Sequence, residues 1–323
     1  MKQIKRNALP ALAVFLALAL AVAAVGFAAA PEPPLFERLS DQQKVALQVI
    51  ADHEVPGQTF QTNVTYYDAT GEWTLRHSGL GNLRLVKCVN DSDDSGFFGY
   101  VYEDPATGAR GFSFRGMEDP KFIARATRDI IDCGGQMFAV DTAQRREALA
   151  MFEECRNKDG LNYLFGHSLG GALAAQVFAE YNEQVRSLFL TNAFPLNAQL
   201  LTEAQKQAFL SDKVEALVID GDMVWRLGEA PWAVRFVKNN HTDDENFVGG
   251  HLLHSMAFDQ AGSAIPEPAP YQEYRLQSAL GLSTRWLIGF FQSLTGAIPE
   301  KTAQPIRQGY EKVQVFIDKL LNN

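Results

Sequence analysis

Residues Leu164–Gly171 read Leu-Phe-Gly-His-Ser-Leu-Gly-Gly, and they join a short apolar run, Leu161–Phe165, to a helical pattern, Leu169–Tyr181. A Gly-x-Ser-x-Gly pattern between a strand and a helix is typical of a tight turn that exposes a serine hydroxyl at the edge of a parallel sheet. Glycines are needed there because a side chain would collide with neighbouring backbone. We therefore expect such a turn, with Ser168 at its apex as a nucleophile.

The residues after this turn support that interpretation over a chance glycine-rich turn. Leu173, Val177 and Tyr181 recur at intervals of four and form an apolar stripe on the predicted helix. Ala172 and Ala174 are small enough to let the helix lie close to a sheet. The strand, the turn and the helix thus agree with one another.

Further apolar runs alternate with helical patterns along the chain, which is typical of a parallel sheet with crossover helices. The runs are Leu161–Phe165, Ser187–Asn192 and Val214–Asp220, and the helical patterns are Thr142–Arg156, Leu169–Tyr181 and Thr202–Leu210. Before them, Phe98–Tyr102 and Arg110–Phe114 flank the turn-rich segment Glu103–Gly108 and predict a β-hairpin. The sequence predicts an α/β fold with a mostly parallel central sheet and helices on both faces.

Three segments resemble one known family. Gly166–Ala174 resembles the nucleophile segment of class 3 (fungal-type) lipases and of their Mbeg1-like bacterial relatives. Gly111–Gly116, which ends in Arg-Gly, resembles the strand that precedes that segment in the family, and Thr191–Pro195 is similar to the family's next strand. The resemblance runs from Phe97 to Phe258, and it implies an α/β-hydrolase fold with Ser168 as the nucleophile.

A serine hydroxyl needs a base to take its proton and an acid to orient that base, and in α/β-hydrolases the acid and then the base follow the serine. Asp222 stands just past the predicted strand Val214–Asp220, where catalytic groups of parallel sheets gather. Gly221–Leu227 also resembles the family's acid-bearing segment. We prefer Asp222 over Asp220, which falls in the strand end, and over an ordinary turn aspartate.

Three histidines follow the predicted acid and are candidates for the base: His241, His251 and His254. His254, with Phe258 close behind it, is similar to the family's triad histidine segment, whereas His251 has the flexible pair Gly249–Gly250 before it. We prefer His254, keep His251 as the alternative and place His241 behind both. The His-x-x-His spacing has no third ligand pattern nearby, so we expect no metal site.

Two backbone N–H groups are expected to hold the oxyanion, one from the residue after the serine and one from the loop after the earlier strand. The first is that of Leu169, and the resemblance puts the second at Met117. Relatives usually have Thr or Ser at this second position, whose hydroxyl can add a hydrogen bond that methionine cannot donate. Arg115 is expected to be structural and to pair with a carboxylate inside the fold.

The N-terminal residues are typical of an exported protein. Lys2, Lys5 and Arg6 precede an apolar run, Ala8–Ala30, that has the layout of a signal peptide and is also long enough to span a bilayer. We expect residues 1–30 to act as a cleaved signal or a retained membrane anchor. The protein would then be secreted, periplasmic or held at the outer face of the cell membrane, with residues 31–323 as a single hydrolase domain.

The C-terminal segment, residues 262–323, contains two helical patterns, Leu280–Leu294 and Ile306–Leu320. We expect them to cover the sheet as core-facing helices. The alternative is a cap over an acyl site, or contact with a lipid surface, through aromatic residues such as Trp286 and Phe290.

Charge and cysteine usage exclude other classes of protein. A formal net charge of −9 over 323 residues argues against nucleic acid as a partner. The cysteines are Cys88, Cys133 and Cys155, none in a Cys-x-x-Cys pair, so no redox or zinc motif is present, and one disulfide stays open.

The sequence therefore predicts a lipase or carboxylesterase that acts on a small-molecule or lipid ester through an acyl-enzyme, with no cofactor. Hydrolysis of thioesters or amides uses the same residues and stays open. The second hypothesis is an exported binding protein that keeps the fold without turnover, and it is motivated by Met117 and by the open choice of the base histidine.

Overall fold

The computed structural model describes residues 32–52, 65–68, 71–74, 80, 82–92, 94–117, 129, 141–196, 198, 201–222, 224–227, 230–240 and 249–268. The chain divides into two units, Met1–Pro33 and Pro34–Asn323, and every helix and strand described belongs to the second. Within the described ranges, no helix has the length and apolarity that a bilayer crossing needs. The expected export segment and the two expected C-terminal helices lie outside these residues.

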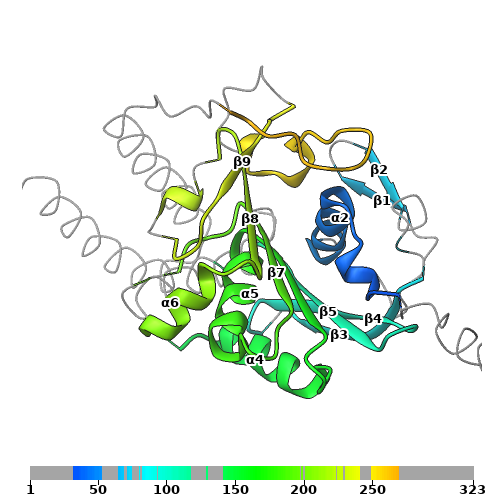
Figure 1. Ribbon diagram of the computed structural model, residues 1–323, viewed down its shortest axis with the longest axis vertical. Coiled ribbons are helices and arrows are strands. Elements are labelled where there is room, and N and C mark those ends of the chain that lie inside the picture. The colour runs from blue at the N-terminus through cyan, green and yellow to red at the C-terminus, as the bar shows by residue number, and fades with distance from the viewer. Residues whose placement is uncertain are drawn as a thin grey trace, which may run out of the picture. The chain divides into compact units, whose positions relative to one another are not determined.

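A seven-stranded sheet in the order β3-β4-β5-β6-β7-β8-β9 forms the centre of the second unit (Figure 1). The strands are β3 Arg84–Asp91, β4 Phe97–Asp104, β5 Ala109–Phe114, β6 Asn162–His167, β7 Ser187–Thr191, β8 Val214–Ile219 and β9 Arg235–Val237. The first three pair antiparallel, and from β5 to β9 all neighbours are parallel. The predicted hairpin is β4 and β5, and the predicted mostly parallel sheet is confirmed.

Helices cover both faces of this sheet, as the α/β-hydrolase fold requires (Figure 1). α2 (Asp41–Asp52) lies on one face against β4, β5 and β6, and α4 (Ala143–Cys155) and α5 (Ser168–Tyr181) lie on the other. α6 (Glu203–Phe209) joins the second layer, where the ring of Phe209 lies 5.1 Å from that of Phe178. The predicted fold class is therefore confirmed.

Burial on both faces explains why the central strands are apolar along their whole length. Every residue of β4 is buried, with Phe98 and Tyr100 in the cluster under α2, and Phe97 and Val101 in the cluster under α4 and α5. β3 lies at the edge, has a charged and half-exposed sequence and was not predicted. β9, with three residues, is too short to show a pattern.

Side-chain caps fix where the predicted helices begin. The hydroxyl of Thr142 accepts a hydrogen bond from the N–H of Arg145 at the start of α4. Thr202 and Gln205 form a reciprocal capping box at the start of α6. Such caps are typically worth about 1 kcal/mol each because they satisfy N–H groups that have no partner within the helix.

Three further short elements precede the sheet in the chain. β1 (Thr65–Asp68) and β2 (Gly71–Thr74) pair antiparallel as a separate hairpin. η1 (Leu35–Glu37) places the ring of Phe36 5.1 Å from that of Tyr163.

Arg115 is buried, and its guanidinium donates to the Ser92 hydroxyl and the Gly96 carbonyl, at 3.1 and 3.0 Å. It thus joins the end of β5 to the turn between β3 and β4.

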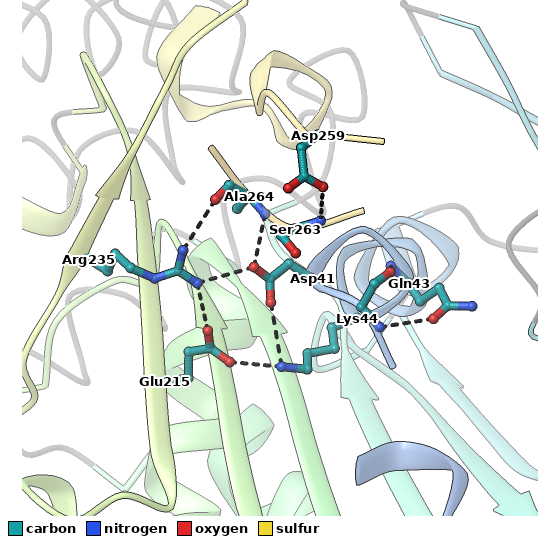
Figure 2. Close-up of polar contacts among 9 residues, drawn as sticks. Asp41, Gln43, Lys44, Glu215, Arg235, Asp259, Ser263 and Ala264 are labelled. Carbon is teal, nitrogen blue, oxygen red and sulfur yellow. Dashed lines mark hydrogen bonds and ion pairs between the residues drawn. The ribbon is translucent and has the colours of Figure 1, made fainter. Parts of the chain in front are cut away.

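A cluster of four charged side chains ties α2, β8 and β9 to the segment that follows residue 258 (Figure 2). Arg235 donates to Asp41 at 3.1 Å and to Glu215 at 2.8 Å, and Lys44 donates to Glu215 at 2.8 Å. Asp41 also accepts from the N–H of Ala264 at 3.0 Å. Burial on its own lowers the pKa of the Arg235 guanidinium. The carboxylates of Glu215 and Asp41 raise it by more, so the pKa of Arg235 is raised overall.

This cluster holds the chain beyond residue 258 at the sheet edge, where it turns at residues 259–262 and then runs alongside β9. Isolated bridges pair Phe258 with Ala264 and Val237 with Pro266. The helical patterns expected within 262–323 begin at Leu280, beyond the described residues, and residues 265–267 pair with β9.

The first turn of α5 lies directly against the ends of β5 and β6. A Cβ added at Gly170 would be 2.1 Å from the carbonyl oxygen of Phe114, and one added at Gly166 would be 2.3 Å from the carbonyl oxygen of Gly170. Backbone atoms cannot move aside as a flexible side chain can, so both positions require glycine.

We predict that Gly170→Ala lowers the melting temperature. Alanine is about 1 kcal/mol better than glycine inside a helix, so helix propensity alone would raise the melting temperature. The clash with Phe114 reverses that sign, because α5 must move off β5. Thermal unfolding followed by circular dichroism checks the sign, and a stabilised Gly170→Ala variant would show that the close approach does not exist.

Candidate active site

Ser168 lies at the junction of β6 and α5, in the sharp turn that its sequence predicts. Its φ angle is 53°, in the left-handed region that non-glycine residues rarely adopt. Strain of this kind costs on the order of 1–3 kcal/mol and persists only where the surrounding packing enforces it. The enforcing contacts here are those of Gly166 and Gly170, which clamp the turn between two backbone segments.

Asp222 follows the end of β8, where the sequence analysis placed it. Gly221 turns the chain with a φ of 89°, and the N–H of Asp222 donates to the carbonyl of Ile219 at 2.9 Å. The Asp222 carboxylate is fully buried and accepts from the N–H groups of Val224 and Trp225, at 3.1 and 3.4 Å. A buried carboxylate needs such donors because burial otherwise disfavours its charge.

His251 connects these two side chains. Its Nε2 lies 2.8 Å from the Oγ of Ser168, and its Nδ1 lies 2.8 Å from an Oδ of Asp222. An ionised carboxylate only accepts hydrogen bonds, so Nδ1 carries the proton and Nε2 is left to accept from the serine hydroxyl. The three side chains therefore have the hydrogen-bond order of a Ser-His-Asp triad.

The histidine in this arrangement is the alternative that the sequence analysis kept, and not its preferred residue. The preferred residue was His254, which lies three residues further along the chain in η5 (Leu253–Ser255). The structure describes the backbone of His254 and not its side chain. His241, the third candidate, lies outside the described residues. The geometry replaces His254 with His251 as the histidine that contacts both Ser168 and Asp222.

Gly250 is the physical reason that His251 reaches the site. A Cβ added at Gly250 would lie 2.7 Å from the carbonyl carbon of Gly221 and 2.8 Å from the backbone nitrogen of Asp222. The residue before His251 thus packs directly on the turn that carries the acid. Gly249–Gly250 was the one sequence signal for this histidine, and its meaning depends on a contact between distant parts of the chain.

The two expected oxyanion donors lie at the same edge of the sheet as Ser168. Phe114 of β5 and Gly166 of β6 are register partners, and Met117 and Leu169 each follow three residues after one of them. Leu169 is buried in the first turn of α5, and Met117 is partly exposed. The close contact between Gly170 and Phe114 holds these two segments together.

The contact that His167 makes in the site was not foreseen. His167, which the sequence analysis treated only as part of the nucleophile turn, is buried, and its Nε2 lies 2.8 Å from the carbonyl oxygen of His251. The two imidazole rings lie 4.9 Å apart. No sequence pattern marks this contact, since the two histidines are far apart in the chain.

A family comparison identifies the chain. The profile described as phospholipase-like, Tle-like phospholipase domain, matches residues 68–246, which is more than half of the chain. The protein belongs to this phospholipase-like family. The matched range contains Ser168 and Asp222 and ends shortly before His251. Membership supports the coarse conclusion that the protein is a hydrolase of lipid esters.

Solved structures similar to this phospholipase-like protein are lipases from fungi. The Lip2 lipase from Yarrowia lipolytica is 14% identical, with 61% of this chain and 77% of that chain covered and a TM-score of 0.40. A triacylglycerol lipase from Penicillium expansum is 14% identical, with 62% and 82% covered and a TM-score of 0.35. Lipase II from Rhizopus niveus is 14% identical, with 61% and 80% covered and a TM-score of 0.36. No curated protein sequence matches the chain.

We predict that His251→Ala and His254→Ala differ sharply in how fast Ser168 reacts with a fluorophosphonate probe. Loss of the histidine that takes the serine proton should slow labelling about a thousandfold or more. His254→Ala serves as the matched control and should label at nearly the wild-type rate. The reverse order of the two rates would return the role to His254.

Proposed function

We propose that the protein is a serine hydrolase that cleaves carboxylic esters of lipids through an acyl-enzyme. The observation that carries this proposal is the hydrogen-bonded sequence Ser168, His251, Asp222, with both contacts at 2.8 Å. This geometry provides a nucleophile, a base within reach of its proton and an acid that orients the base. Membership in the phospholipase-like family supports a lipid ester as the substrate.

In the first half-reaction, the Oγ of Ser168 attacks the ester carbonyl carbon while Nε2 of His251 takes the hydroxyl proton. The buried carboxylate of Asp222 stabilises the imidazolium that forms. The tetrahedral intermediate then collapses, the bond to the alcohol oxygen breaks, and His251 gives its proton to that oxygen. In the second half, His251 takes a proton from water, the water oxygen attacks the acyl carbon, and the fatty acid leaves as Ser168 regains its proton.

The backbone N–H groups of Leu169 and Met117 are the proposed donors to the oxyanion. Their support is the register of β5 and β6 and the contact of Gly170 with Phe114. Such donors act where negative charge develops, so they lower the barrier more than they strengthen substrate binding. Methionine supplies its backbone N–H but lacks the side-chain hydroxyl of the class 3 lipase pattern.

We further propose that the enzyme acts outside the cytoplasm. Support comes from Lys2, Lys5 and Arg6 ahead of the apolar run Ala8–Ala30, which has the layout of an export signal. Lipid substrates would then be reached from the outer face of a membrane. The second function considered from the sequence, a binding protein without turnover, loses support from the contact between His251 and Ser168.

The test of the proposed function is hydrolysis of p-nitrophenyl esters of increasing acyl length, and of phosphatidylcholine vesicles, by wild-type protein and Ser168→Ala. We expect Ser168→Ala to lose at least about a thousandfold in kcat. Mass spectrometry of the vesicle products should show free fatty acid and lysophospholipid. Release of the phosphorylated headgroup, or turnover that Ser168→Ala retains, would contradict a serine ester hydrolase.

The pair Met117→Thr and Met117→Val tests the oxyanion assignment. The two side chains have nearly the same shape, and only threonine can donate a hydroxyl hydrogen bond. We expect Met117→Thr to exceed Met117→Val in kcat by about tenfold, with similar KM, since one added donor acts mainly on the transition state. Equal kcat values would contradict an oxyanion within reach of a hydroxyl at residue 117.

A further inference from the structure

The main chain of His251 is held by side chains from other elements. His251 ends η4 (Gly249–His251), a turn of three residues rather than a strand, so no ladder of backbone hydrogen bonds fixes it. A histidine that serves as a base must nevertheless stay within hydrogen-bond distance of both its partners. The groups that bond its carbonyl are therefore candidates for a role in positioning.

Asn192, the residue after β7, makes one of these bonds and also bonds the carbonyl of the residue that precedes His251. Its side chain is fully buried, and its Nδ2 donates to the carbonyls of Gly250 and His251, both at 3.0 Å. Its Oδ1 accepts from the N–H of Ile219 at 2.8 Å. Two carbonyls require donors and an N–H requires an acceptor, so the partners themselves fix which end of the amide is nitrogen.

Residues 192–194 also make hydrogen bonds close to the other two triad residues, Ser168 and Asp222. Ile219, which donates to the Asn192 side chain, accepts from the N–H of Asp222 at 2.9 Å. The N–H of Phe194 donates to the carbonyl of Ser168 at 2.9 Å. Residues 192–194 thus touch the backbone at or beside the nucleophile, the acid and the base.

His167 supplies the second hydrogen bond to the His251 carbonyl. Its Nε2 lies 2.8 Å from that oxygen, which can only accept, so this nitrogen carries a proton. A carbonyl oxygen has two lone pairs, and Asn192 and His167 fill both. The base is therefore held from the last residue of β6, which directly precedes Ser168, and from the residue after its neighbour, β7.

The backbone of Asn192 also suits a constrained role. Its φ angle is 45°, and asparagine is among the few residues other than glycine that tolerate this region. Its own N–H donates to the Leu217 carbonyl at 2.9 Å, which continues the pairing of β7 with β8. The left-handed turn then aims the amide toward η4 rather than along the sheet.

From these contacts we infer that Asn192 is a positioning residue of the hydrolase: with His167, it holds the main chain of His251 so that the imidazole stays between Ser168 and Asp222. The inference rests on the proposed function, because it assigns Asn192 to the working geometry of the same triad. Asn192 touches no reacting atom, and its effect on the reaction passes through His251.

Asn162 provides a matched control for a merely structural role. It is equally buried, its Nδ2 donates to the carbonyls of Asn157 and Gln184 at 2.8 and 2.9 Å, and its Oδ1 accepts from the N–H of Asn157. It begins β6, at the end of the strand opposite to Ser168, which follows the last residue of β6. A change from Asn to Asp at either residue therefore replaces an amide NH2 donor by a carboxylate oxygen. Only Asn192 adjoins the triad.

The experiment compares Asn192→Asp with Asn162→Asp on a p-nitrophenyl ester, below the melting temperature of both. Both variants should lose thermal stability, because each sets a carboxylate against two carbonyl oxygens. Only Asn192→Asp should lose kcat, by about a hundredfold, with KM within about threefold of wild type, as expected when a reacting group is misplaced. Its rate of fluorophosphonate labelling should fall in parallel.

A kcat for Asn192→Asp equal to that of Asn162→Asp would overturn the inference and leave the proposed function intact. Wild-type protein without serine-dependent hydrolysis would overturn both. If Asn192→Asp does not fold, His167→Leu takes its place, since it removes the other hydrogen bond to His251. We then expect a loss of about tenfold in kcat. His167→Gln keeps a hydrogen-bond donor and should recover part of that loss. A wild-type kcat for His167→Leu would refute the inference that these side chains position His251.

Discussion

The close approach of the first turn of α5 to the ends of β5 and β6 is the constraint on which the site depends. It holds only because residues 166 and 170 have no side chain, since a Cβ at either would overlap a backbone oxygen. The approach forces Ser168 into a left-handed conformation and lifts its hydroxyl toward the edge of the sheet. It also brings the segment after β5, with Met117, beside the N-terminus of the helix. A single packing contact thus places the nucleophile and both proposed oxyanion donors.

Local sequence predicted the parts of the fold and site that short-range rules determine. The hairpin, the parallel strands and the helices from Thr142 to Leu210 follow from apolar runs, turn residues and caps, which act over a few neighbours. Ser168 and Asp222 were found because each follows closely after a recognisable strand. The edge strands β3 and β9 were not found, because one is half-exposed and the other has three residues.

Local sequence did not identify the histidine that acts as the proposed base. It favoured His254 over His251, but the choice depends on how Gly250 packs against Gly221 and Asp222, nearly thirty residues away. The same holds for Asn192, whose side chain bonds residues on β8 and η4. Contacts of this kind are tertiary, and a single sequence contains no periodicity or spacing that reports them. The interactions that adjust a catalytic site are therefore the ones that a sequence reveals last.

The most direct measurement is a crystal structure of the protein inactivated with a long-chain alkyl phosphonate, which resembles the tetrahedral intermediate of ester hydrolysis. We expect phosphorus bonded to the Oγ of Ser168, with the phosphonyl oxygen accepting from the N–H groups of Leu169 and Met117 and the His251 ring between Ser168 and Asp222. Phosphorus on another residue, a phosphonyl oxygen remote from both N–H groups, or His254 in place of His251 would contradict the proposed site.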